Sequence, residues 1–218
     1  RVKGERNIRK FNYETIRVLP EGLAAAFCFT MDDKGNSTDD ETLAGDVLLV
    51  DIGAYTLDVI YLVNGQFNAD YLDKSSYAKF GLFDTVYNKI SSKVNSMGRD
   101  WSTKNDNDID AAIRQGIEAG DYSIHSAGKS IDLKPMLTHN VQRYTDAAIN
   151  EVFERHYDGL RGIKSMILVG GGADLMERYF KDAYGNKVIN SNSHPSTRDI
   201  GAVFMNAVGG LRSAKATV

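Results

Sequence analysis

An aspartate ends a predicted buried apolar run, and a tight turn that contains glycine and alanine follows it. Within Asp46–Val63 (DVLLVDIGAYTLDVIYLV), the first apolar run ends on Asp51, and a second begins at Thr56 after a short turn. The amides of such a turn can form a concave nest for phosphate oxygens, and a carboxylate beside them can hold hydrated Mg²⁺. The alternative is an ordinary hairpin whose aspartate caps the turn, and these residues alone do not decide between the two.

A second turn suited to a ligand follows the short apolar run Ser165–Val169 (SMILV), which ends at three consecutive glycines, Gly170–Gly172. Glycine lets a ligand lie against the backbone, because a Cβ there would block its approach. A turn that only packs a helix explains a triple glycine about as often. Both turns, however, lie at the ends of predicted strands, where open α/β sheets bind their ligands.

The elements that must position these turns alternate between strands and helices. Asn64-Gly65 is a strong hairpin signal, so a third antiparallel strand is expected over Gln66–Tyr71. A β-meander followed by helices and a strand–glycine–helix unit predicts an α/β layer architecture. Further strands are expected over residues 8–19 and Lys187–Asn190, a hairpin over 123–133, and an exposed acidic loop over Asp32–Asp46. The expected helices are a short one opened by Pro20, and longer ones over Lys79–Met97, Asp106–Glu118 (capped by Asp106 or Asp108), 135–160, Ala173–Tyr184 and Ser196–Leu211.

Composition describes a soluble globular protein. The 218 residues are 42% hydrophobic and carry a net charge of −3, and the absence of a polybasic run argues against direct binding of nucleic acid or membranes. The single cysteine, Cys28, excludes an internal disulfide and fits a reducing cytoplasm. No apolar run reaches the ~20 residues of a membrane span, and we expect a cytoplasmic protein without a signal peptide.

The order of four motifs resembles the actin, heat-shock-chaperone and sugar-kinase ATPase superfamily. VLPEGLAAAF resembles its connecting helix, VDIGAYTLD its second phosphate loop, ILVGGGADLM its adenosine motif, and GAVFMNAVG its second connecting helix. Within the superfamily, the chain is most similar to the bacterial actin-like proteins of the ParM/StbA group and their archaeal relatives. The superfamily's first phosphate loop, an Asp-x-Gly, is absent, so the chain resembles only the C-terminal half of such a protein.

This resemblance implies an actin-like (ribonuclease H-like) ATPase fold, with a mixed sheet, a β-meander and flanking helices. It divides the chain into the end of a first domain with a connecting helix and acidic loop (1–45), the second major domain (46–200), and a closing connecting helix (201–218). It also implies an ATPase that binds ATP and Mg²⁺, polymerises with ATP, and segregates plasmid DNA, which it contacts only through a DNA-binding adaptor protein. Because the chain would carry only one of the two phosphate loops, it would bind nucleotide weakly or not at all in isolation.

The resemblance also assigns roles to single residues. Asp51 would hold Mg²⁺ through water, and Glu21 would orient or deprotonate the attacking water. Both roles meet the needs of phosphoryl transfer to water. The less favoured alternative for Glu21 is a first-turn acid that the helix dipole stabilises. Asp58 is expected to bond the turn amides as a structural residue. The β- and γ-phosphates would meet Gly53, Ala54, Tyr55 and Thr56, and the ribose and purine would meet Gly170, Gly171, Gly172 and Ala173.

The second phosphate loop departs from the superfamily's usual pattern. It has Ala54 where glycine is usual and Tyr55 beside it, which narrows the room next to a phosphate. Two alternatives therefore stay open. One is a small-molecule kinase of the same superfamily, although we find no base for a sugar hydroxyl and no sugar-binding insertion. The other is a structural filament or scaffold protein that is indifferent to nucleotide.

Overall fold

A mixed β-sheet lies at the centre of the part of the chain that the computed structural model describes, which is residue 16, residues 18–20 and residues 22–216. In these residues the strand order is β3-β2-β1-β7-β8, and β4 also pairs with β2. The strands are β1 (Asp46–Ile52), β2 (Leu57–Val63), β3 (Gln66–Phe67), β4 (Ser76–Tyr77), β7 (Ser165–Val169) and β8 (Val188–Asn190).

Strand β1 lies between the two strands that matter most for a ligand site. It runs antiparallel to β2, with Asp51 opposite Asp58, and parallel to β7, with Asp51 opposite Val169. Parallel strands place their carboxyl ends at the same edge of a sheet. The turn that follows β1 and the glycines that follow β7 are therefore neighbours.

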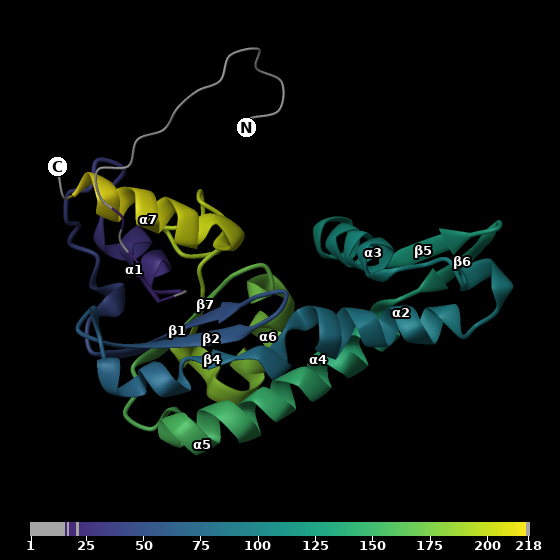
Figure 1. The fold of residues 1–218 in the computed structure, drawn as a ribbon, viewed down its shortest axis with the longest axis horizontal. Helices are drawn as coiled ribbons and strands as arrows, with labels where there is room; N and C mark the ends of the chain where they lie inside the picture. Colours follow the sequence, from purple (N-terminus) through teal and green to yellow (C-terminus); the bar gives the residue numbers. More distant parts are fainter. Residues whose placement is uncertain (1–15, 17, 21, 217–218) are drawn as a thin grey trace, which may run out of the picture.

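Helices cover both faces of this sheet (Figure 1). Helices α1 (Leu23–Thr30) and α7 (Met205–Lys215) lie on one face, and α4 (Lys134–Ala148), α5 (Glu154–Tyr157) and α6 (Ala173–Tyr184) on the other. Side chains alternate along β1 as the pleat requires. Leu48, Val50 and Ile52 join the larger core on the α4 and α6 side, whereas Val47 and Leu49 pack with α1 and α7.

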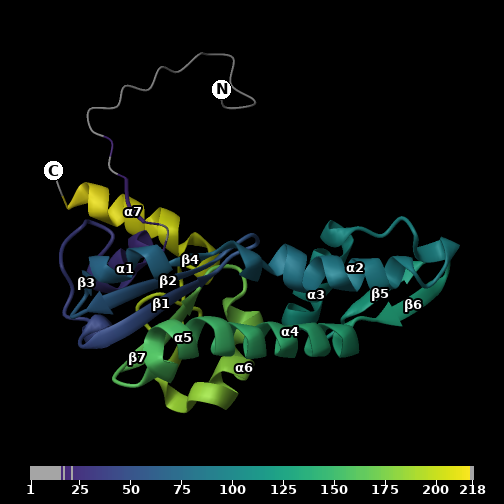
Figure 2. The same cartoon turned by 60° about the horizontal axis from the view of Figure 1, so that its bottom comes forward.

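An arm of the fold extends beyond the end of the sheet (Figure 2). It consists of α2 (Asn88–Asn95), α3 (Asp106–Ala119), the hairpin of β5 (Ser123–Ser126) and β6 (Lys129–Asp132), and the first part of α4. The arm has a core of its own side chains, which include the buried Trp101 and Ile109. It is continuous with the larger core of the sheet.

Most expected elements are present in the described residues. The long helix over 135–160 is confirmed as α4 and α5, which a π-helical turn at Ile149–Phe153 joins. Helix α6 and the hairpin of β5 and β6 are also confirmed. The turn at Asn64-Gly65 is confirmed, with both residues at positive φ (49° and 74°), as a two-residue hairpin requires. The alternating strand and helix pattern was therefore sufficient to predict the α/β architecture.

Several element boundaries differ from expectation. The third strand ends at Phe67 because the side chain of Asn68 accepts the N–H of Asp70 and starts a 3-10 turn. The N-cap of the second helix is Asn105 rather than Asp106 or Asp108, and Asp108 completes the capping box by accepting the N–H of Asn105. The helix expected from Lys79 begins with a π-helical turn at Phe83–Tyr87. The strand expected over residues 8–19 lies mostly outside the described residues.

The two helices of the α1–α7 face also begin later than expected. Helix α1 starts at Leu23, after Gly22 with a φ of 86°, so Pro20 precedes the helix and does not open it. Helix α7 starts at Met205, because residues 191–200 form a series of turns. None of the helices in the described part of the chain has the length and hydropathy of a membrane span.

Candidate functional site

The two predicted ligand turns meet at the carboxylate of Asp51. Gly170 has a φ of 82°, and a Cβ at this position would overlap Oδ1 of Asp51 and lie 2.8 Å from the carbonyl oxygen of Ile52. The N–H of Gly172 donates to that same carbonyl at 3.0 Å. Glycine is therefore required at position 170, both for its backbone conformation and for its contact with Asp51.

Asp51 lies at the end of β1 with only 7% of its surface exposed. Its Oδ2 accepts a hydrogen bond of 2.6 Å from the side-chain amide of Asn206 on α7. Asn206 was not predicted as a site residue, because only the apolar positions of its helix were considered. No local sequence pattern marks this asparagine, because its partner Asp51 lies 155 positions away.

The turn after β1 is held from one side by the start of the next helix. Its first residue, Gly53, donates its N–H to the carbonyl of Thr56 at 2.9 Å. The carbonyls of Gly53 and Ala54 accept from the N–H groups of Leu82 and Phe83, at 3.2 and 2.9 Å. The carbonyl oxygens of the turn are thus occupied by the protein, which fixes the orientation of its peptide planes.

The amides of the same turn are available for a ligand. Within the described residues, no protein acceptor is found for the N–H groups of Ala54, Tyr55 and Thr56. The Tyr55 side chain is 73% exposed and stacks on Phe83, with ring centroids 5.5 Å apart. Successive N–H groups without protein acceptors are the arrangement that binds an anionic oxygen.

Asp58 does not bond the turn amides, as the sequence had led us to expect. Its Oδ2 accepts the hydroxyl of Thr56 at 2.5 Å, and the carboxylate is almost completely buried. A hydroxyl has one proton to donate, so in this geometry Thr56 directs that proton to Asp58. Asp58 therefore fixes the side chain of Thr56, whose N–H remains the group that faces outward from the turn.

The glycines after β7 have different surroundings. A Cβ at Gly171 would meet nothing within 4 Å, whereas a Cβ at Gly172 would come 2.8 Å from Leu82 and overlap Ile52. The side chain of Ala173 is fully buried in the larger core. Gly171 is thus the residue of the motif with space open to a ligand. Gly170 is closed by Asp51, and Gly172 and Ala173 pack the start of α6 against the sheet.

Glu21, the predicted water-activating residue, lies outside the described residues. Its neighbour Gly22 is described and lies against the same end of the sheet. A Cβ at Gly22 would lie 3.1 Å from Ile60 and 3.9 Å from the Cβ of Asp51. Helix α1 thus begins next to Asp51.

Cys28, on α1, is almost completely buried against α7. Its Sγ donates to the carbonyl of Met205 at 3.2 Å. Burial raises the pKa of the Cys28 thiol to about 11, so it is neutral at physiological pH. Cys28 is a packing residue, as expected from its apolar sequence context.

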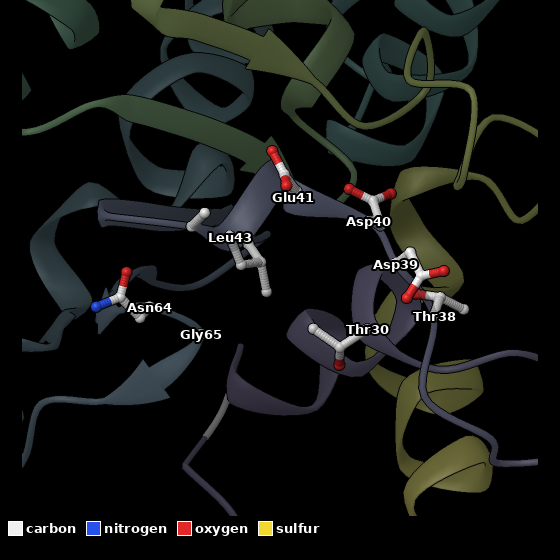
Figure 3. Close-up of a pocket in the computed structure, with 9 residues that line it drawn as sticks. Thr30, Thr38, Asp39, Asp40, Glu41, Leu43, Asn64 and Gly65 are labelled. Atoms are coloured by element: carbon white, nitrogen blue, oxygen red, sulfur yellow. The ribbon is translucent and has the colours of Figure 1, made fainter.

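A cavity lies at the other end of β1 (Figure 3). Its volume is about 350 Å³, and Asn64 and Gly65 of the turn after β2 line it. The Val63 that precedes this turn pairs with Asp46, the first residue of β1, so the cavity is separated from Asp51 by the length of the strand. The other residues that line it are Thr30, Thr38, Asp39, Asp40, Glu41, Leu43 and Ala44. Three acidic side chains make it unsuited to a phosphate.

The donor groups at Asp51 fit Mg²⁺ bound together with a nucleotide. No cluster of three or more histidine, cysteine, aspartate or glutamate side chains that could hold a metal occurs in the described residues. Mg²⁺ usually takes one or two carboxylates, several waters and the phosphates of the substrate. A single carboxylate beside a turn with open amides meets that requirement.

Comparison with solved structures reveals the same fold in several actin-like proteins. A ParM filament from Clostridium botulinum superposes with a TM-score of 0.70 at 22% identity, over 96% of this chain and 56% of that one. The archaeal actin homologue Ta0583 in complex with ADP gives 0.63 at 15% identity, over 92% of this chain and 57% of that one. The actin-like protein Alp7A gives 0.64 at 15% identity, over 90% and 52%.

The chain therefore spans little more than half the length of these proteins. The predicted actin-like fold is confirmed, and the matched portion corresponds to a C-terminal domain. No curated protein sequence matches the chain. The family model of the archaeal actin homologue MreB-like C-terminal domain matches residues 49–182, which contain the later part of β1, the turn after it, the arm and the triple glycine. The chain belongs to this family of actin homologues.

Proposed function

We propose that this chain is the nucleotide-binding second domain of an actin-like ATPase that polymerises with ATP and hydrolyses it in the filament. Membership of the actin homologue family supports this proposal, and so does the fold it shares with a ParM filament and with an actin homologue solved with ADP. In the domain division we propose, residues 46–200 form the second domain. Residues 1–45 and 201–218 contribute the connecting helices, among them the packed pair α1 and α7.

The observation that carries the proposal is the meeting of two ligand-suited turns at one carboxylate. Gly170 lies against Oδ1 of Asp51, while the N–H groups of Ala54, Tyr55 and Thr56 find no acceptor in the described residues. A phosphate chain and a nucleoside need these two surfaces side by side. The convergence depends on the parallel pairing of β1 and β7, and an ordinary capped hairpin would not require it.

Each residue then has a specific task in hydrolysis. Mg²⁺, when bound with the nucleotide, neutralises charge on the β- and γ-phosphates. Asp51 holds the metal's water and helps to place the attacking water, and Glu21 orients or deprotonates that water. The phosphates are bound by the amides of Ala54, Tyr55 and Thr56, because the N–H of Gly53, although predicted to take part, donates to the carbonyl of Thr56. The ribose and purine lie along Gly171, since the other predicted contacts, Gly170, Gly172 and Ala173, are packed against Asp51 and the core.

The partners follow from the same proposal. The full-length protein associates with copies of itself, as expected from the fold it shares with a ParM filament. It segregates plasmid DNA in the cytoplasm, and it contacts this DNA through a DNA-binding adaptor. The net charge of −3 is consistent with indirect contact, because direct binding of DNA depends on a basic surface.

The test is to measure light scattering and phosphate release together on the full-length polypeptide that contains this chain. We expect ATP and Mg²⁺ to induce assembly, followed by release of phosphate. Glu21→Ala should still assemble while its phosphate release is lost, and the isolated 218-residue chain should bind nucleotide weakly. A sugar-type kinase would give a different result. It would transfer phosphate from ATP to a sugar, and it would neither assemble nor release free phosphate after assembly.

A nucleotide-indifferent scaffold is the second candidate, and Tyr55 is the observation that favours it. The tyrosine stands in the turn that would bind phosphate, and its ring is fixed on Phe83. If the ring obstructs the phosphate, filaments should form equally well with and without ATP. Equal light scattering under both conditions would replace the ATPase proposal with the scaffold.

A further inference from the structure

Asn206 connects three elements that are far apart in the sequence. Its Nδ2 donates to Oδ2 of Asp51 at 2.6 Å, and its Oδ1 accepts the backbone N–H of Ala25 on α1 at 3.2 Å. A carboxylate accepts hydrogen bonds and a backbone N–H donates them, so the chemistry of the two partners fixes the orientation of the amide. Both the NH₂ group and the carbonyl oxygen of the Asn206 side chain therefore form hydrogen bonds within the protein.

The helix that carries Asn206 is held tightly against α1. A Cβ at Gly209 would overlap the carbonyl oxygen of Ala24, so the two helix backbones are in contact. Arg212 donates to the carbonyl of Cys28 at 2.8 Å, and Cys28 in turn donates to the carbonyl of Met205. Helices α1 and α7 therefore form one packed unit. Any movement of this pair against the sheet also moves Asn206.

The bond from Asn206 also defines what each oxygen of Asp51 faces. The terminal torsion of an aspartate has broad energy wells, so the carboxylate is oriented by its hydrogen bonds more than by its rotamer. Oδ2 is directed to Asn206, and Oδ1 lies over Gly170, at the start of the glycine motif. The second oxygen is thus presented on the side where the proposed nucleotide lies.

We propose that Asn206 is a positioning residue for the proposed ATP hydrolysis. It orients the carboxylate of Asp51 and fixes the distance between Asp51 and the start of α1, which Glu21 precedes in the sequence. Movement of the α1–α7 pair against the sheet changes this geometry directly. The inference depends on the proposed function, because it assigns Asn206 a role at the same site.

The test compares Asn206→Ala and Asn206→Asp with the wild-type full-length polypeptide. Asn206→Asp keeps the shape of the side chain and its acceptor for Ala25, but it replaces the amide donor with a second carboxylate that repels Asp51 or shares a proton with it. We expect both variants to lower single-turnover hydrolysis by about 10- to 100-fold. We expect the dissociation constant for ATP with Mg²⁺ to change by less than about 3-fold, because the binding surfaces stay intact.

Arg212→Ala is the matched control. It removes another hydrogen bond between α7 and α1, one that is remote from Asp51, so it should lower the melting temperature and leave turnover per folded molecule unchanged. Melting curves of all variants identify any that fail to fold.

The outcomes separate this inference from the proposed function. If Asn206→Ala hydrolyses ATP at the wild-type rate while Asp51→Asn is inactive, the positioning role is wrong and the ATPase proposal holds. If Arg212→Ala slows turnover as much as Asn206→Ala, the effect is structural and the inference is overturned. A wild-type polypeptide that hydrolyses no nucleotide overturns both.

Discussion

Gly170 is packed directly against the carboxylate of Asp51, and a methyl group on Gly170 would occupy the position of Oδ1. Gly170 directly follows β7, and Asp51 lies one residue before the end of the neighbouring parallel strand β1. Their contact joins the turn that we propose for phosphate to the glycines that we propose for the nucleoside. The predictions below test this junction and the elements that support it.

Replacing Gly170 with alanine should destabilise the fold. The new methyl group meets Asp51, and alanine is strained at a φ of 82°, so we expect a loss of about 3 kcal/mol in the free energy of unfolding. Gly171→Ala is the control, because a Cβ there meets nothing within 4 Å, and its stability should change by less than about 1 kcal/mol. Urea unfolding of the two variants measures the difference. Equal stabilities would contradict the packing of Gly170 against Asp51.

Gly171→Ala also tests the ligand surface. Its methyl group points into open space, where the proposed nucleoside lies. In the full-length polypeptide this variant should therefore keep its melting temperature and bind ATP with Mg²⁺ more weakly, by about 10-fold. Isothermal titration measures the affinity. Unchanged affinity would place the nucleoside elsewhere.

Asp51→Asn should abolish hydrolysis without unfolding the protein. An asparagine keeps an oxygen that can accept from Asn206, so the melting temperature should change little. Without the negative charge, Mg²⁺ is held more weakly, and we expect hydrolysis in the full-length polypeptide to fall by about 100-fold or more. The exposed Asp70 is the control for loss of one charge, and Asp70→Asn should hydrolyse ATP at the wild-type rate. Hydrolysis by Asp51→Asn near that rate would remove Asp51 from the site.

Alanine substitutions at two adjacent glycines of α7 should change the stability of the protein in opposite directions. Gly209→Ala drives a methyl group into the carbonyl of Ala24 and should cost about 3 kcal/mol of stability. A Cβ at Gly210 meets nothing within 4 Å, so Gly210→Ala should stabilise the helix by about 0.5–1 kcal/mol. Thermal unfolding of the two variants gives both signs. A neutral Gly209→Ala would show that α1 and α7 pack less closely.

The stability contributed by Asp40 should depend on pH. Partial burial raises the pKa of Asp40, but hydrogen bonds from Ser196 and Thr42 outweigh it, and the pKa lies below its ordinary value of 3.8. A lowered pKa in the folded state means that the ionised carboxylate stabilises the fold above this ordinary value. That contribution is lost as the pH falls through the folded-state pKa.

Asp40→Asn should therefore be less stable than the wild type by about 1 kcal/mol at neutral pH. The difference between the two should shrink as the pH falls below 3.8. Urea unfolding at neutral and acidic pH measures it, with the exposed Asp39→Asn as the control. A difference that stays constant with pH would show that the charge of Asp40 is not involved.

The sequence was informative where the signals are local. The hairpin turn at Asn64-Gly65 and the triple glycine after a buried strand are each encoded in a few consecutive residues, and both are present as expected. The proximity of Asp51 to Gly170 was also foreseeable, because both follow the ends of predicted strands. These features require no knowledge of distant contacts.

Features that depend on side-chain hydrogen bonds between distant residues were not predicted from the sequence. Asn206 lies 155 positions from Asp51, and no local pattern marks their bond. The late start of α7 has a similar cause. The side chain of Asn192 accepts the N–H of Ala202 at 2.6 Å, and that of Thr197 donates to Ser191, which stabilises turns where helical periodicity had been expected. Asp58 bonds Thr56 instead of the turn amides because Thr56 offers a closer donor.

The parallel pairing of β1 with β7 has a consequence for the order in which the protein is made. The hairpin of β1 and β2 needs only neighbouring residues, so it can form early during synthesis on the ribosome. Its partner β7 and helix α7 emerge much later, and until then the apolar residues Val47 and Leu49 have no helix pair to cover them. We therefore expect the nascent chain to bind chaperones until Asn206 has been synthesised, and truncations that end before α7 to aggregate.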